Sequence, residues 1–193
     1  MHEEQRRALD YLARKGTHAS VDTLRAQLRK AFADIEARFE GVIVDDRDAQ
    51  PAPGKWSAHQ ILDHLVLSHG PAIPQFASLL AGITPEGIAI PANLQSADAD
   101  RASWDALRTR LGEIHAEFVR LADGAADDLS LEPKALVAIV VKAGGEIVEW
   151  LQPLDWKAFL QGVRVHTLEH QAQLERTTQN VFLSSKQNQA SAV

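Results

Sequence analysis

The chain has 193 residues, of which 45% are hydrophobic and 24% charged, and its formal net charge is −6. This balance suits one globular domain with a sizeable core, and the basic residues form no run or stripe that would favour a nucleic-acid partner. The absence of cysteine excludes disulfides, thiolate metal ligands and a cysteine nucleophile. No apolar run reaches the roughly 20 residues that a membrane helix needs, and the N-terminal residues do not resemble a signal peptide. We therefore expect a cytoplasmic protein without a membrane or nucleic-acid partner.

The first half of the chain predicts a short leading helix and two long ones. Residues 1–16 are rich in helix formers and end at a glycine, so we expect an N-terminal helical extension. Apolar residues then recur at steps of three and four, as in a core-facing helix: Val21, Leu24, Leu28, Phe32, Ile35 and Phe39. Ser57 and Gln60 form a capping-box pattern that begins the next helix. Pro71 and Pro74 predict a break or strong kink in that helix.

The second half predicts two further helices with a small β-hairpin between them. A helix over about 98–122 carries apolar residues at the same spacing: Trp104, Leu107, Leu111, Ile114, Phe118 and Leu121. Residues 136–151 contain two segments rich in β-branched residues on either side of Gly144–Gly145, a pattern typical of a hairpin. The last helix is expected over about 156–180.

These elements indicate an all-α protein built as an up-down helical bundle. We expect residues 17–181 to form the bundle domain, after the helical extension of residues 1–16. The polar segment 182–193 is expected to be a disordered tail.

Two of the eight histidines have the spacing of a metal site. His166 and His170 lie four residues apart in the last predicted helix, so both imidazoles leave the same face one turn apart. A third ligand would come from the helix that carries His59, His64 and His69, whose steps of five turn each side chain in a different direction. His64 is flanked by apolar residues and is the most inward candidate. Such a pair also arises by chance, with solvated or hydrogen-bonded side chains, so the spacing alone leaves both possibilities open.

The other polar candidates near these histidines are expected at the surface. His59 is close to a helix start and His69 to the Gly-Pro segment, so both are expected to be surface or capping residues. Asp63 and Glu169 point away from the ligand face on the helical wheel and are expected to be surface charges.

Two segments of the chain resemble motifs of the DinB-like family, in the superfamily of DinB/YfiT-like metalloenzymes. Trp56–Leu65, with the sequence WSAHQILDHL, is similar to the family's second-helix motif, in which a His-Leu pair supplies the first ligand. Val165–Leu174, with the sequence VHTLEHQAQL, is similar to its last-helix motif of two histidines followed by Gln and an aliphatic residue. The resemblance implies an antiparallel four-helix bundle, often dimeric, in which His64, His166 and His170 bind a divalent metal such as nickel or zinc.

The resemblance leaves the reaction open, because fold and site do not fix chemistry. Some relatives are transferases or isomerases that use low-molecular-weight thiols, and others are hydrolase-like. A thiol transferase fits a chain without cysteine, because the thiol would then be a cosubstrate. The alternatives are a metal-dependent hydrolase and a non-catalytic bundle in which the histidines bind metal for stability or a helical face binds a partner. We expect a small-molecule substrate, a homodimer and a metal affinity that does not depend on His59 or His69.

Overall fold

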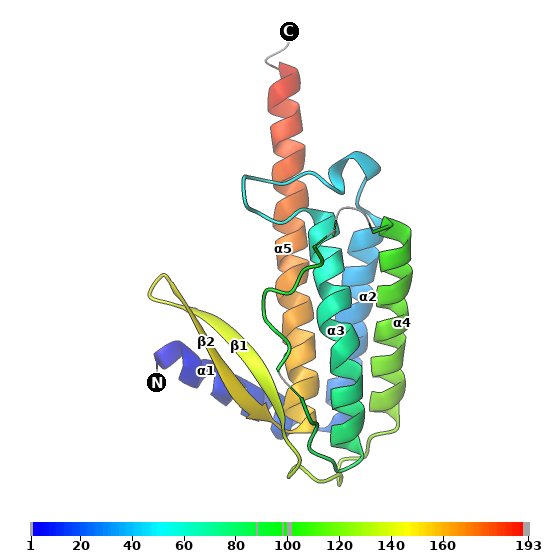
Figure 1. Cartoon of the computed structure of the whole chain (residues 1–193), viewed down its shortest axis with the longest axis vertical. Helices are drawn as coiled ribbons and strands as arrows, with labels where there is room; N and C mark the ends of the chain where they lie inside the picture. The colour runs from blue at the N-terminus through cyan, green and yellow to red at the C-terminus, as the bar shows by residue number, and fades with distance from the viewer. Residues whose placement is uncertain (1, 88, 98, 100–101, 191–193) are drawn as a thin grey trace.

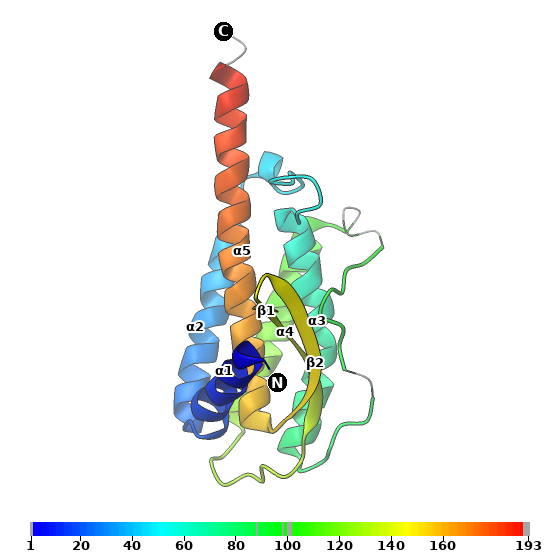
Figure 2. The same cartoon turned by 90° about the vertical axis from the view of Figure 1, so that its left-hand side faces the viewer.

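The computed structural model describes residues 2–87, 89–97, 99 and 102–190. Its elements, in chain order, are α1 (Glu3–Leu12), a π-helical turn (Ala13–Thr17), α2 (Val21–Glu40), a 3₁₀ turn (Val44–Asp46), α3 (Ala58–Leu80), α4 (Trp104–Asp123), β1 (Ala135–Ala143), β2 (Glu146–Leu154) and α5 (Trp156–Ala190). The four long helices α2, α3, α4 and α5 lie side by side as a bundle, with α1 and the two strands against one end of it (Figure 1). Figure 2 shows α1 and the hairpin together on the α5 side of the bundle.

The long helices do not alternate in direction along the chain, which corrects the predicted up-down order. The ring of Trp104 at the start of α4 meets Phe39 at the end of α2, whereas Phe118 of α4 meets Phe76 near the end of α3. Helices α3 and α4 are therefore parallel, and α4 is antiparallel to α2. The physical reason is the long connection between α3 and α4, whose described residues 89–97 return along α3 and hydrogen-bond to its first turns through Ser96.

Helix α3 is continuous, so the predicted break at Pro71 and Pro74 is wrong. Both prolines lie three residues apart on the exposed face of the helix, where the carbonyl groups they leave without a donor can be hydrated. On the other face Ala72, Phe76 and Leu79 are buried in the core. This packing holds the helix together across the prolines.

The predicted hairpin is confirmed. Strands β1 and β2 pair antiparallel with Ala143 opposite Glu146, so the turn has two residues. Gly144 and Gly145 have φ angles of 60° and 91°, the left-handed backbone that a two-residue type I′ turn requires.

The predicted apolar stripes face the interior of the bundle. All six predicted apolar positions of α2 are buried, as are the central positions of α4, and they form two hydrophobic clusters along the bundle. Helix α5 continues to Ala190, through most of the segment that we expected to be disordered; residues 191–193 lie outside the described part of the chain. Within the described residues, none of the helices is both long and apolar enough to cross a membrane.

Candidate metal centre

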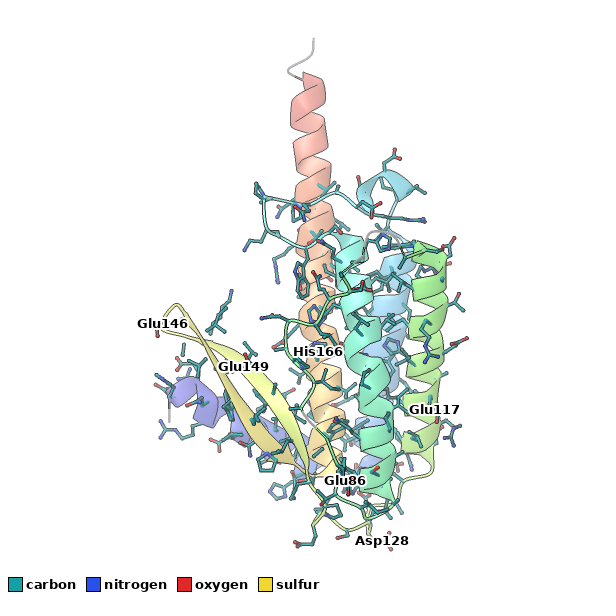
Figure 3. The ribbon with its side chains drawn as sticks, in the orientation of Figure 1. Glu86, Glu117, Asp128, Glu146, Glu149 and His166 are labelled. Carbon is teal, nitrogen blue, oxygen red and sulfur yellow. The ribbon has the colours of Figure 1, made fainter. Side chains whose placement is uncertain are left out.

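The structure brings the three predicted ligands together. His64 lies on α3, and His166 and His170 lie one turn apart on α5. Figure 3 shows His166 in the middle part of the bundle. The His166 Nε2 atom is 3.0 Å from Nε2 of His64 and 3.1 Å from Nε2 of His170. One ligand nitrogen from each side chain lies within 4.8 Å of the other two. The three imidazoles therefore converge on one point.

Each of these imidazoles uses its other nitrogen to contact the protein. Nδ1 of His64 lies 2.7 Å from the carbonyl oxygen of Leu94, and Nδ1 of His170 lies 2.9 Å from Oε1 of Gln173. Carbonyl oxygens only accept hydrogen bonds, so these two Nδ1 atoms carry the proton and their Nε2 atoms carry a lone pair. Both lone pairs point at Nε2 of His166 from hydrogen-bonding distance, so a proton or a cation is needed between these nitrogens.

The chemistry of this donor set suits a divalent cation. Zinc binds imidazole nitrogen at about 2.0–2.1 Å, and a tetrahedral arrangement at that distance places ligand nitrogens about 3.3–3.4 Å apart. The two Nε2–Nε2 distances of 3.0 and 3.1 Å are close to this spacing. Three ligands from the protein leave at least one coordination position for a substrate or water.

Burial keeps the three imidazoles in the form that binds metals. It lowers the pKa of His166 well below its usual value, with a further lowering by neighbouring His170 and His64. Burial also lowers the pKa of His170 to about 4, although the hydrogen bond to Gln173 opposes this. The pKa of His64 is lowered by burial against the effect of the Leu94 carbonyl. All three side chains are therefore neutral near pH 7, and neutral imidazole is the ligand form.

Trp56 forms an aromatic wall beside the three histidines. Its ring stacks on His170 with a centroid distance of 6.0 Å and an interplanar angle of 9°. It also packs against His64 with a centroid distance of 5.0 Å. The tryptophan that precedes α3 thus restricts the position of two of the three ligands.

Asp63 is buried, so its predicted surface position is wrong. It is 3% exposed, and its carboxylate accepts hydrogen bonds from the backbone N–H of Ser96 at 2.9 Å and its hydroxyl at 3.0 Å. These bonds fix the segment that carries Leu94, the acceptor for His64. Glu169 is exposed, as predicted.

His59 and His69 are also buried, which corrects their predicted surface positions. They are 5% and 2% exposed. A helix with a single buried face would leave both side chains exposed, but α3 packs against both α4 and α5 and residues 94–96 cover a third side. Nδ1 of His59 lies 2.7 Å from the carboxylate of Asp48, whereas His69 contacts His166.

Two functional candidates were missed by the sequence analysis. His115 of α4 contacts His69, and Glu36 of α2 contacts His115. The available signal was the position of His115 directly after Ile114 in the apolar seam of α4, which predicts a buried imidazole. Nothing in the local sequence indicates its partners, because they belong to other helices.

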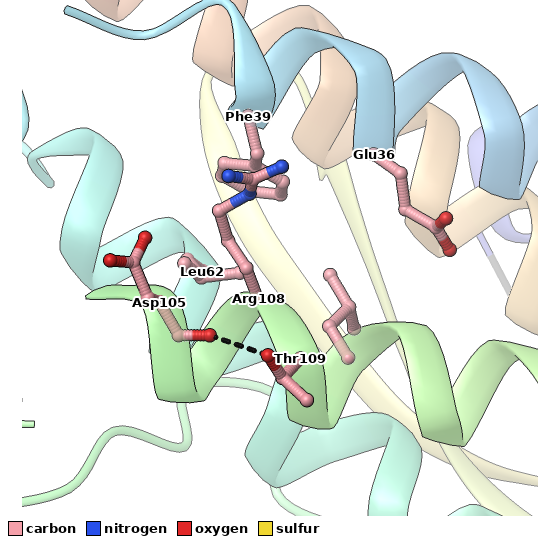
Figure 4. A pocket seen from close by; sticks show the side chains of 7 residues that line it. Glu36, Phe39, Leu62, Asp105, Arg108 and Thr109 are labelled. Carbon is pink, nitrogen blue, oxygen red and sulfur yellow. Dashed lines mark hydrogen bonds between the residues drawn. The ribbon is translucent and has the colours of Figure 1, made fainter. Parts of the chain in front are cut away.

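A surface cavity of about 270 Å³ lies between α2 and α4, on the side of Glu36. Figure 4 shows Glu36 on α2, and Asp105, Arg108 and Thr109 on α4. None of the three converging histidines lines this cavity.

The structure is similar to that of YfiT from Bacillus subtilis, which is described as a probable metal-dependent hydrolase with an unusual four-helix bundle topology. The TM-score is 0.61 and the sequence identity 19%, and the match covers 83% of this chain and 87% of that one. At this identity the likeness shows a common fold. No match was found among curated proteins. The sequence profile of the DinB superfamily matches residues 27–174, a span that contains α3, α4 and all three converging histidines, and the chain therefore belongs to the DinB superfamily.

Proposed function

We propose that this protein is a metal-dependent hydrolase of a small molecule, with His64, His166 and His170 as the ligands of one divalent cation. The observation that carries the proposal is the convergence of three neutral imidazoles through their Nε2 atoms. Protein carbonyl oxygens already occupy Nδ1 of His64 and His170. A purely structural histidine cluster would not need to direct several lone pairs to one point.

The residues of the chain hold and orient the reacting groups. When bound, a divalent cation supplies Lewis acidity and lowers the pKa of water toward neutrality. The Leu94 carbonyl and the Gln173 side chain fix the tautomers and ring orientations of their histidines. The indole of Trp56 excludes water from one side of His64 and His170.

Hydrolysis is preferred to the other reactions because of the fold relative. YfiT is described as a probable metal-dependent hydrolase, and its fold is shared here. Transfer of a low-molecular-weight thiol is the second candidate, supported by the absence of cysteine from the chain, since the thiol would then arrive as a cosubstrate. A non-catalytic metal-binding bundle is the third.

The donor set also limits the metal. Imidazole nitrogens suit zinc, nickel, copper and iron, whereas magnesium and calcium prefer oxygen ligands. We propose zinc or nickel. We also propose that the protein acts as a homodimer; apolar side chains exposed on the hairpin support this part of the proposal.

The metal site is tested by titrating the metal-free protein with Zn²⁺ or Ni²⁺ and counting bound ions. We expect one ion per chain. His170→Ala removes a ligand itself, so it should weaken metal binding by more than about 100-fold, the upper end of the range for losing an outer-shell partner. The matched control is His59→Ala, which removes a buried imidazole of the same bundle that does not contact the ligands and should leave the affinity unchanged. Equal affinity in the wild type and His170→Ala would disprove the site.

The reaction is tested with the metal-loaded protein on ester and amide substrates, with and without an added small thiol. Turnover in the absence of thiol that is lost in His170→Ala supports hydrolysis. Turnover only in the presence of thiol replaces hydrolysis with the transferase. Metal binding without turnover in either assay leaves the non-catalytic bundle.

A further inference from the structure

A continuous chain of polar contacts runs from the metal centre across the bundle to the surface. Nδ1 of His166 lies 3.1 Å from Nε2 of His69, Nδ1 of His69 lies 3.3 Å from Nε2 of His115, and Nδ1 of His115 lies 2.5 Å from Oε1 of Glu36. The four residues belong to α5, α3, α4 and α2 in this order. Each long helix of the bundle therefore contributes one member, and we call this set the Glu36 relay.

The two central members of the Glu36 relay are enclosed by apolar side chains. His69 and His115 are both 2% exposed. Phe32 stacks on His115 with a centroid distance of 3.7 Å and an interplanar angle of 3°, and Phe118 packs edge-on against His69. A buried polar group without a partner destabilises the fold by several kcal/mol, so both nitrogens of each ring require partners. The contacts within the relay provide all of them.

The acceptor at the surface end determines where every proton lies. The carboxylate of Glu36 accepts, so Nδ1 of His115 donates to it, and the neutral ring of His115 then has only an acceptor at Nε2. Nδ1 of His69 must donate to that acceptor, which makes Nε2 of His69 an acceptor in turn. Nδ1 of His166 therefore carries its proton, and Nε2 of His166 keeps the lone pair that points at His64 and His170.

We propose that Glu36, acting through His115 and His69, is a positioning residue that holds His166 in the tautomer required for metal binding. This inference rests on the proposed metal centre. His64 and His170 have acceptors of their own in Leu94 and Gln173, whereas Nδ1 of His166, among the residues that the structure describes, contacts His69 of the relay. A carboxylate commonly orients a metal-binding histidine through one hydrogen bond; here two additional imidazoles lie between them.

Glu36→Gln tests the relay with little risk to folding, because the Glu36 side chain is 43% exposed and the change preserves its shape. Co²⁺ serves as the probe, and its visible absorption reports the ligand geometry while a competing chelator gives the affinity. We expect Glu36→Gln to weaken Co²⁺ binding by about 10-fold, the lower end of the range for outer-shell partners. Unchanged Co²⁺ affinity and absorption would overturn the proposal.

Asp48→Asn is the matched control. It removes an exposed carboxylate that contacts a buried histidine, His59, at 2.7 Å, but that histidine is not part of the Glu36 relay. We expect wild-type Co²⁺ affinity in this variant. An equal loss in both variants would mean that the effect comes from general charge removal, which overturns the specific role of Glu36.

A second measurement separates failure of the relay from failure of the metal centre. Nitrogen NMR of the metal-free protein labelled in its histidines reports the tautomer of each ring without any metal. We expect the Nδ1–H form for His69, His115 and His166 in the wild type, and a mixture of tautomers in Glu36→Gln. The Nε2–H form of His115 or His166 in the wild type would overturn the relay. If the tautomers are as expected but Co²⁺ does not bind, the metal centre fails and the relay stands only as an internal hydrogen-bond chain.

Discussion

Five of the eight histidines form a single cluster linked by ring nitrogens 3.0–3.3 Å apart. Burial is the largest cause of the lowered pKa of each of them: His64, His69, His115, His166 and His170. Five neutral imidazoles in the interior of one bundle need directed partners. The cluster therefore combines stability and function, because the same hydrogen bonds that satisfy the buried rings also fix the direction of the Nε2 lone pairs.

Leu111 illustrates the apolar side of the same interior. It is 1% exposed in the seam of α4. Leu111→Ala should lower the free energy of unfolding by about 2–5 kcal/mol, because it leaves a cavity that the neighbours only partly fill. Chemical denaturation measures this loss, and Leu107→Ala at the half-buried position one turn earlier should cost less. A loss below about 0.5 kcal/mol for Leu111→Ala would contradict the assigned packing.

For single residues, the sequence predicted the three metal ligands better than it predicted the residues that contact them. The spacing of His166 and His170 follows from helical geometry alone, and the motif around His64 supplied the third candidate. The proximity of these three residues could be predicted because they come from only two helices, α3 and α5. The contacts of His69 with His115 and of His115 with Glu36 depend on how α3 packs against two further helices, α4 and α2, which no local pattern contains.

At the scale of elements, caps and turns were the most predictable features. Ser57 and Gln60 form the expected capping box at the start of α3, and the paired glycines form the expected hairpin turn. These features depend on interactions within a few residues. The continuity of α3 across Pro71 and Pro74 was not predictable, because packing of the opposite face outweighs the local cost of the prolines.

The hairpin turn gives a test that compares two kinds of glycine. Gly145→Ala should destabilise the protein by about 1–2 kcal/mol, because its φ of 91° is unfavourable for any residue with a Cβ. Gly112→Ala within α4 is the matched control: a Cβ there meets no atom within 4 Å, so the change should stabilise the protein by about 0.4–1 kcal/mol. Thermal melts of both variants measure the difference. The same effect in both variants would contradict the turn geometry.

For the whole molecule, the topology depends on the connection between α3 and α4. A short loop would make these helices antiparallel, but residues 89–97 return along α3, and the start of α4 lies beside the end of α2. The helical class and the hairpin were predictable from periodicity, whereas the direction of α4 was not, because the connection has no periodic pattern. Its path is fixed by the buried carboxylate of Asp63, which looked like a surface charge in the sequence.

The exposed face of the hairpin leads to a prediction about assembly. Four apolar side chains share this face and are at least 37% exposed: Leu136, Val140, Ile147 and Leu151. Contiguous exposed apolar side chains are typical of contact surfaces. We expect a dimer at micromolar concentration by light scattering, and a monomer after Ile147→Lys combined with Leu151→Lys. Ile83→Lys, at another exposed apolar position, should leave the dimer intact, and a wild-type monomer would contradict the prediction.

The stability of the metal-free protein should depend on pH through its buried histidines. Their pKa values in the folded protein are lower than the usual 6.5, and that of His170 is about 4. Between these two values the unfolded chain binds more protons than the folded protein, so acid shifts the equilibrium toward unfolding. The stability should therefore be complete above pH 6.5 and should decrease progressively as the pH falls toward 4. Thermal melts from pH 7 to pH 5 measure this decrease above the range in which most carboxylates titrate.

Removal of one buried imidazole provides the control for that pH dependence. His170→Ala eliminates one group whose pKa differs between the folded and unfolded states, so its melting temperature should change less steeply with pH than that of the wild type. Saturating Zn²⁺ should raise the melting temperature of the wild type at pH 7 by mass action. This increase should shrink as the pH falls, because protons compete with the metal for the same Nε2 lone pairs. A melting temperature that is constant from pH 7 to pH 5 in the metal-free wild type would show that the histidines are not buried in their neutral form.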